Sequence, residues 1–111
     1  MQIILEQTRD ILSIRLAGEL DHHAAKEVFD QFTALNAAIP HRCELDLSGL
    51  NFMDSSDIAV VLGLRKRLLS IGSALTVRGV PEQAFRVFRA SGVDKLVKIE
   101  RSQEATYETH K

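Results

Sequence analysis

The stretch RCELDLSGLNFMDSSDIAVVLG, residues 42–63, places a strand, a polar turn and a helix in direct succession. In residues 42–49 apolar residues alternate with polar ones, which predicts a half-buried strand over this range. The inward-facing set is Cys43, Leu45 and Leu47. From Ile58 the apolar residues recur three or four positions apart, which predicts an amphipathic helix that runs to Gly72. The polar residues DSSD, 54–57, therefore lie between the end of a strand and the start of a helix.

The same two periods continue on both sides of this stretch. Alternation predicts further strands at residues 11–18 and 74–79, and short apolar segments predict a first strand at 2–7 and a last one at 96–99. The helical spacing predicts helices at 21–39 and 81–91. Helices that separate consecutive strands imply a mostly parallel sheet, to which the first strand adds an antiparallel hairpin. A strand covered on both faces would be apolar throughout. The alternation thus predicts a single α/β domain, residues 1–111, with its helices mainly on one face of a mixed, mostly parallel sheet.

Composition narrows the class of protein. The 111 residues are 45% hydrophobic and 26% charged, with a formal net charge of −1, which argues against a nucleic-acid binder. No apolar run approaches the length of a membrane span, and the amino terminus turns polar too early for a signal peptide. Cys43 is the single cysteine, so no internal disulfide can form. These features predict a cytoplasmic protein.

The residues 54–57 allow three interpretations. Asp54 as N-cap and Asp57 at the third helical position would form a helix cap, but this leaves the two serines unexplained. A nucleophilic serine is disfavoured, because Ser55 lies outside any G-x-S-x-G elbow and no histidine is placed to reach it. A phosphate on a serine here would meet the free amides of a helix start. Spacing alone favours the cap over the phosphorylation site.

Asp21, His22 and His23 are adjacent residue types that can bind a metal ion. Neighbouring helical residues point about 100° apart, so the two histidines cannot easily share one ion. The sequence therefore predicts an N-cap followed by two polar residues, and no metal or cofactor.

Three segments carry a family resemblance: GELDHHAA (18–25), LDLSGLNFMDSSDIAVVLG (45–63) and VFRASGVDKLVKI (87–99). They resemble, in this order and over nearly the whole chain, the STAS-domain anti-sigma factor antagonists, most closely the sporulation (sigma-F pathway) branch. The resemblance implies a non-enzymatic regulator of transcription that works by partner switching. The unmodified form would bind an anti-sigma factor and release its sigma factor.

The resemblance also assigns the switch. The anti-sigma factor is a serine kinase that uses ATP to phosphorylate the serine after the motif's aspartate, here Ser55, and the modified form dissociates until a serine phosphatase restores it. The residues implied to surround the phosphorylation site and contact the partner are Asp21, His22, Asp54, Ser56 and Asp57. Nucleic acid and membrane are not expected as partners, and a monomer is expected, with a weak dimer as the alternative.

One position departs from the family pattern D-S-[ST]-G, because Asp57 replaces the glycine. Its carboxylate is expected to lie beside the modified hydroxyl, where it would oppose the partner. Replacing Asp57 with glycine is then expected to lower stability but to raise both partner affinity and phosphorylation rate. The alternative function is a constitutive STAS interaction module, in a signalling assembly or beside a transporter, without a working switch.

Overall fold

A computed structural model describes residues 2–20, 22–34 and 40–101 of the chain. The strands are β1 (Gln2–Gln7), β2 (Ile11–Glu19), β3 (Arg42–Phe52), β4 (Ala74–Val80) and β5 (Lys98–Arg101). The α-helices are α1 (His22–Thr33), α2 (Ile58–Ser70) and α3 (Glu82–Ser91), and short 3-10 turns η1 (Ser55–Asp57) and η2 (Val93–Lys95) precede α2 and follow α3.

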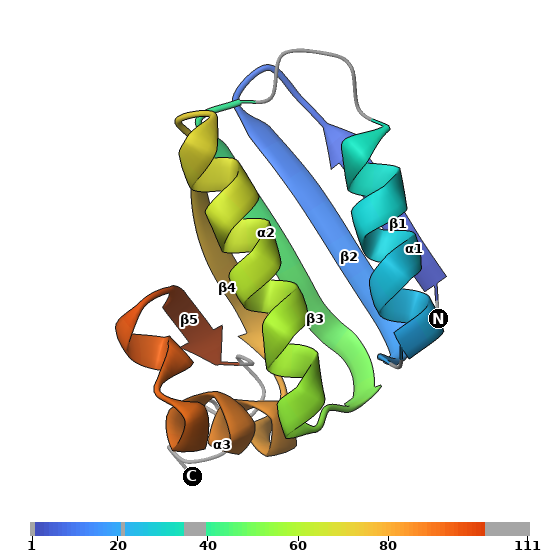
Figure 1. The fold of residues 1–111 in the computed structure, drawn as a ribbon, viewed down its shortest axis with the longest axis vertical. Coiled ribbons are helices and arrows are strands. Elements are labelled where there is room, and N and C mark those ends of the chain that lie inside the picture. The colour runs from blue at the N-terminus through green and yellow to red at the C-terminus, as the bar shows by residue number, and fades with distance from the viewer. Residues whose placement is uncertain (1, 21, 35–39, 102–111) are drawn as a thin grey trace, which may run out of the picture.

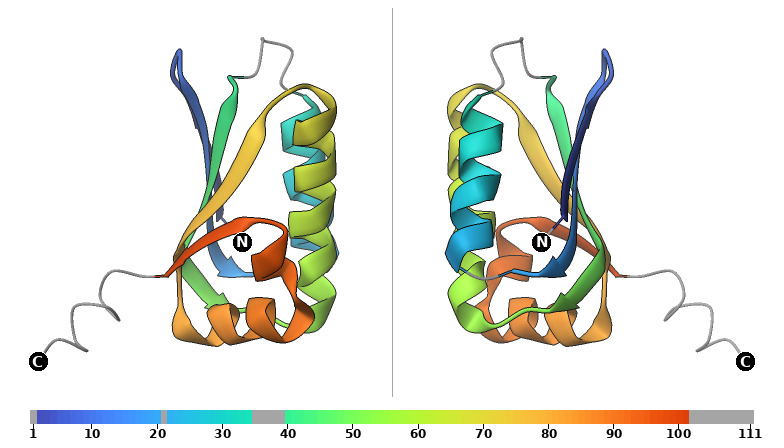
Figure 2. Two further views of the ribbon diagram at one scale, coloured as in Figure 1. Left: turned by 90° about the vertical axis from the view of Figure 1, so that its left-hand side faces the viewer. Right: turned by 90° about the vertical axis from the view of Figure 1, so that its right-hand side faces the viewer.

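The strands lie in the sheet in their chain order, β1-β2-β3-β4-β5. β1 is antiparallel to β2, and the other three pairs are parallel. Because each parallel crossover steps to the next strand in the same direction, right-handed connections put the helices on one face. Figures 1 and 2 show α1 and α2 side by side on that face, with α3 across the end of the sheet. The predicted fold class is confirmed.

The core lies between the sheet and its helical layer. Register pairs align the buried strand residues, for example Leu12 with Cys43 and Leu45 with Val77. On the uncovered face Arg15, Asp46 and Arg78 are register partners, and Arg78 also donates diagonally to Glu44 Oε1 at 3.4 Å. The alternation of apolar and polar residues along the strands thus corresponds to one covered and one uncovered face of the sheet.

Some element boundaries differ from the prediction. α1 ends at Thr33, and the remainder of the predicted helix, residues 35–39, lies outside the described part of the chain, as does residue 21. β3 continues to Phe52 because it stays paired with β2 through register shifts near its end. α3 ends as predicted, since Gly92 takes the left-handed conformation (φ 82°) that favours glycine.

Cys43 occupies the predicted inward position and is 1% exposed, with its thiol free. Burial, and secondarily the charge of Glu44, raises the pKa of this thiol to about 12. Only about one molecule in ten thousand would then carry the reactive thiolate at pH 8. We expect an aromatic disulfide reagent to label Cys43 at pH 8 only as fast as the protein opens, and at once in guanidinium. Rapid labelling of the native protein would contradict the buried position.

Candidate functional site

The carboxyl ends of the parallel strands β2, β3 and β4 meet at one edge of the sheet, where α1, α2 and α3 also begin (Figure 1). In α/β sheets this edge is where ligands and partners usually bind. The turn that follows β3, from Met53 to Asp57, lies at this edge and contains the DSSD residues.

Ser55 opens the 3-10 turn η1 and its side chain is exposed, as is that of Asp54. On either side of these residues the chain is anchored in the core, because Met53 is 0% exposed and Ile58 is also buried. The turn therefore presents the Ser55 hydroxyl to solvent from a firmly attached backbone.

Gln83, in the first turn of α3, holds the backbone just before this turn. Its Oε1 accepts a hydrogen bond from Met53 N at 3.0 Å, and its Nε2 donates to Met53 O at 2.6 Å. One side-chain amide thus satisfies both polar backbone groups of a buried residue, which would be costly to leave unpaired.

Asp57 holds the turn from the other end. Its Oδ2 accepts a hydrogen bond from Asp54 N at 3.0 Å, and Asp57 N donates to Asp54 O at 3.1 Å. A carboxylate that accepts from the backbone N–H three residues earlier agrees with the helix-cap interpretation of this spacing. The helix start differs, because η1 comes first and α2 begins only at Ile58.

The position of Asp57 corrects one expectation from the sequence. Asp57 is only 5% exposed, so its carboxylate is buried and does not face a partner. Its backbone (φ −77°, ψ −14°) lies in the ordinary helical region, so nothing in the turn requires the family's glycine.

Three other predicted site residues are only partly described. Asp21 and the side chains of His22 and Ser56 lie outside the described residues. The backbone places α1 directly after β2, whose last residue, Glu19, is the register partner of Phe52. The start of α1 is therefore at the same edge as the Ser55 turn.

Sequence reasoning missed two residues at this edge. Gln83 gave no signal, since a glutamine in the first turn of a helix resembles any polar surface residue. Phe52 is 53% exposed although it closes an apolar strand. An aromatic side chain exposed beside Ser55 is a typical anchor for a protein partner.

His41 is not placed to assist Ser55. His41 lies at the other end of β3, where its Nδ1 is 3.3 Å from Gly72 O. Within residues 2–20, 22–34 and 40–101, no three histidine, cysteine or acidic side chains gather as a metal site. None of the helices over the same residues is long and apolar enough to cross a membrane.

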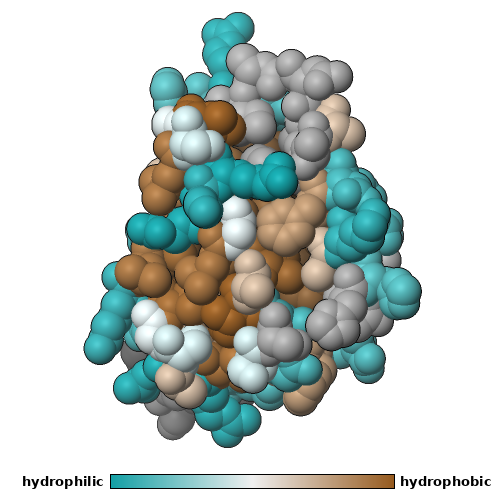
Figure 3. Space-filling model, in the orientation of Figure 1, coloured by the Kyte–Doolittle hydropathy of each residue, from teal (hydrophilic) through white to brown (hydrophobic). Residues whose placement is uncertain are grey.

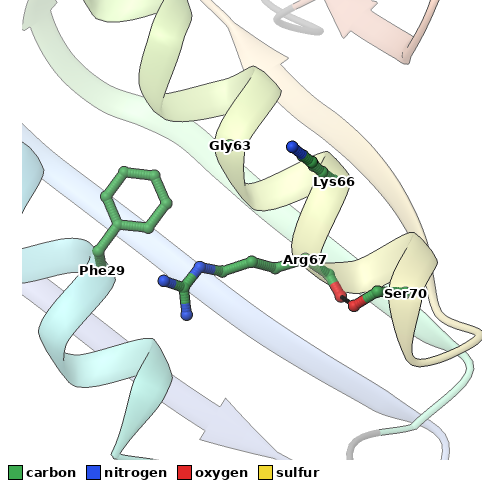
Figure 4. A pocket seen from close by; sticks show the side chains of 5 residues that line it. All are labelled: Phe29, Gly63, Lys66, Arg67 and Ser70. Carbon is green, nitrogen blue, oxygen red and sulfur yellow. Dashed lines mark hydrogen bonds between the residues drawn. The ribbon is translucent and has the colours of Figure 1, made fainter.

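The helical face has a separate groove. Hydrophobic side chains gather across the middle of this face and hydrophilic ones border them (Figure 3). Between α1 and α2 a groove of about 540 Å³ is lined by Phe29, Gly63, Lys66, Arg67 and Ser70 (Figure 4). Gly63 keeps it open, since a Cβ there would lie 2.6 Å from Phe29 Cζ, and the Arg67 guanidinium carbon lies 5.7 Å from the centre of the Phe29 ring. This groove is toward the carboxyl end of α2, whereas Ser55 precedes the amino end.

Comparison with known proteins gives consistent results. The STAS domain family model matches residues 2–106. The chain is 39% identical over 103 residues to an anti-sigma F factor antagonist of Paenibacillus polymyxa, an alignment that covers 89% of this chain and 86% of the relative. It is similar in structure to the anti-sigma factor antagonist SpoIIAA in its unphosphorylated form (TM-score 0.75, 29% identity, 98% of this chain and 96% of that one). It is also similar to the Bacillus cell fate determinant SpoIIAA in the phosphorylated form (TM-score 0.69, 29% identity, 97% and 99%).

Proposed function

The chain belongs to the STAS domain family, and we propose that it is an anti-sigma factor antagonist switched by phosphorylation of Ser55. The observation that carries this proposal is the exposed Ser55 hydroxyl, presented on a turn that Gln83 and Asp57 hold in place. Similarity to a protein solved in both an unphosphorylated and a phosphorylated form supports it. The identity to an anti-sigma F factor antagonist favours the sigma-F class of partner.

In this mechanism the unmodified protein binds the anti-sigma factor through the exposed edge formed by Phe52, Asp54 and Ser55, and the sigma factor is released. The anti-sigma factor then acts as the kinase. The Ser55 oxygen attacks the γ-phosphorus of ATP, ADP leaves, and the hydroxyl proton passes to a base of the kinase. The phosphate adds between about −1.5 and −2 charges to the edge that the partner covers, so the complex separates. A serine phosphatase restores the hydroxyl, and the protein itself catalyses neither step.

The position of the phosphate tests this proposal. Incubation with ATP and the cognate anti-sigma kinase should add one phosphate per chain, and phosphopeptide mapping should locate it on Ser55. Ser55→Ala should take up none and still bind the partner. Label on Ser56 in the unaltered chain would contradict the assignment.

A different outcome would favour the other function considered from the sequence. Firm partner binding without any phosphate transfer would indicate a constitutive STAS interaction module. The buried position of Asp57 supports the switched form of the proposal over this alternative, since its carboxylate does not crowd the exposed edge.

A further inference from the structure

We infer that Gln83 is a positioning residue for phosphate transfer: it fixes the backbone that carries Ser55 and so sets the rate of phosphorylation more than the affinity for the kinase. This inference rests on the proposed function of Ser55. Its structural basis is the pair of hydrogen bonds that joins the Gln83 amide to Met53 N and Met53 O.

The location of Met53 explains why such a residue is needed. β3 pairs with β4 only as far as Asp46 opposite Arg78, and with β2 as far as Phe52 opposite Glu19. Met53 follows the last of these pairs and is still fully buried. The amide of Gln83 therefore does for Met53 what a neighbouring strand does for the rest of β3.

Gln83 is itself held in place by its neighbours. Glu82 forms an ion pair with Arg101 at the end of β5, and the Arg101 guanidinium carbon lies 4.6 Å from the centre of the Phe85 ring. These contacts join the first turn of α3 to β5. Through Gln83, the position of Met53 is therefore fixed relative to α3 and β5, and not by the turn alone.

The consequence for Ser55 follows from the short chain between them. Only Asp54 separates Met53 from Ser55, and its N–H is bonded to Asp57. With the Gln83 bonds to Met53 and the Asp57 bond to Asp54 N in place, the Ser55 hydroxyl occupies a defined position relative to the core. Transfer to a hydroxyl requires the reacting atoms to approach within about 3–3.5 Å in line, and small misplacements lower the rate strongly. The side chains proposed to contact the partner, Phe52, Asp54 and Ser55, stay exposed when Gln83 is replaced. The affinity for the partner should therefore change little.

Two variants separate the parts of this interaction. Gln83→Ala removes both hydrogen bonds. Gln83→Glu keeps the size and the acceptor for Met53 N, but it places an oxygen against Met53 O in place of the donor. Arg86→Ala is the matched control, since Arg86 is exposed on the same helix. Cys43→Ala, at the opposite end of β3, controls for a general loss of stability.

Single-turnover phosphorylation with ATP and the anti-sigma kinase gives the decisive measurement, at a temperature where every variant is folded. We expect about a tenfold slower transfer step in both Gln83 variants, with partner Kd changed less than threefold, and unaltered transfer in both controls. Equal slowing in Cys43→Ala, or wild-type transfer in Gln83→Ala, would overturn the inference.

Amide hydrogen exchange provides a readout independent of any kinase. The Met53 amide should lose protection in Gln83→Ala and keep it in Arg86→Ala. If Gln83→Ala alone loses Met53 protection but the unaltered chain takes up no phosphate, the proposed function is wrong, while the contact between Gln83 and Met53 is confirmed. If Met53 keeps its protection in Gln83→Ala, the inference itself is wrong.

Discussion

Phosphorylation of Ser55 is expected to weaken binding to the anti-sigma factor by a hundredfold or more while leaving the fold intact. A hundredfold change corresponds to about 2.7 kcal/mol. A phosphate carries about −1.5 to −2 charges, and here it would join the exposed carboxylates of Asp54 and Glu19 at one edge. Burying that charge against a partner surface shaped for a hydroxyl costs several kcal/mol, so the effect is large.

The fold should tolerate the same phosphate, because Ser55 is exposed and lies just before the amino end of α2, whose dipole favours negative charge. Titration calorimetry of the two forms measures the loss of affinity, and circular dichroism should superimpose. Ser55→Ala, treated in parallel with kinase and ATP, should retain full affinity throughout. Unfolding on phosphorylation, or equal affinity of both forms, would contradict the mechanism.

Replacement of Asp57 with glycine should destabilise the protein by about 2.5–4 kcal/mol. The change removes a charge-assisted hydrogen bond to Asp54 N, which contributes about 1.5–3 kcal/mol, and adds the backbone entropy of glycine, about 1 kcal/mol. The melting temperature should fall by more than about 10 °C. Affinity for the kinase should not rise, because the carboxylate removed is a buried one.

Two variants make this result specific. Asp57→Asn keeps an acceptor of the same size without the charge, and should lose only about 1 kcal/mol. Asp94→Gly makes the same chemical change at an exposed position in η2, and should have a much smaller effect. A gain in partner affinity or phosphorylation rate in Asp57→Gly would show that the carboxylate reaches the partner after all.

The sheet and its helices could be predicted because each strand is half-buried. Leu12, Ile14 and Leu16 alternate with polar residues since one side of the sheet meets helices and the other meets water. β3 extends to Phe52, beyond the residue 49 that alternation predicts, because its last residues depend on pairing with β2, which is a tertiary contact. Periodicity carries no information about such pairing.

The turn of residues 54–57 between a strand and a helix could be predicted, but its internal contacts could not. The spacing of Asp54 and Asp57 indicated a carboxylate that turns back to the chain, and the structure contains that bond. The direction of Asp57 into the protein could not be derived from spacing, and comparison with the family pattern suggested the opposite. Gln83 lies 30 residues from its partner Met53, and a contact over that distance leaves no local mark in the sequence.

The strand order has a consequence for the way the chain reaches its structure. Every strand is adjacent only to strands that are its neighbours in sequence. Because none of the described strands pairs with a strand that is remote in sequence, the sheet can form strand by strand as the ribosome releases the chain. The edge that carries Ser55 is then completed late, when α3 emerges and Gln83 reaches Met53. A chain that lacked the residues from 83 onward would have four of the five strands, but the turn that carries Ser55 would not be held by Gln83.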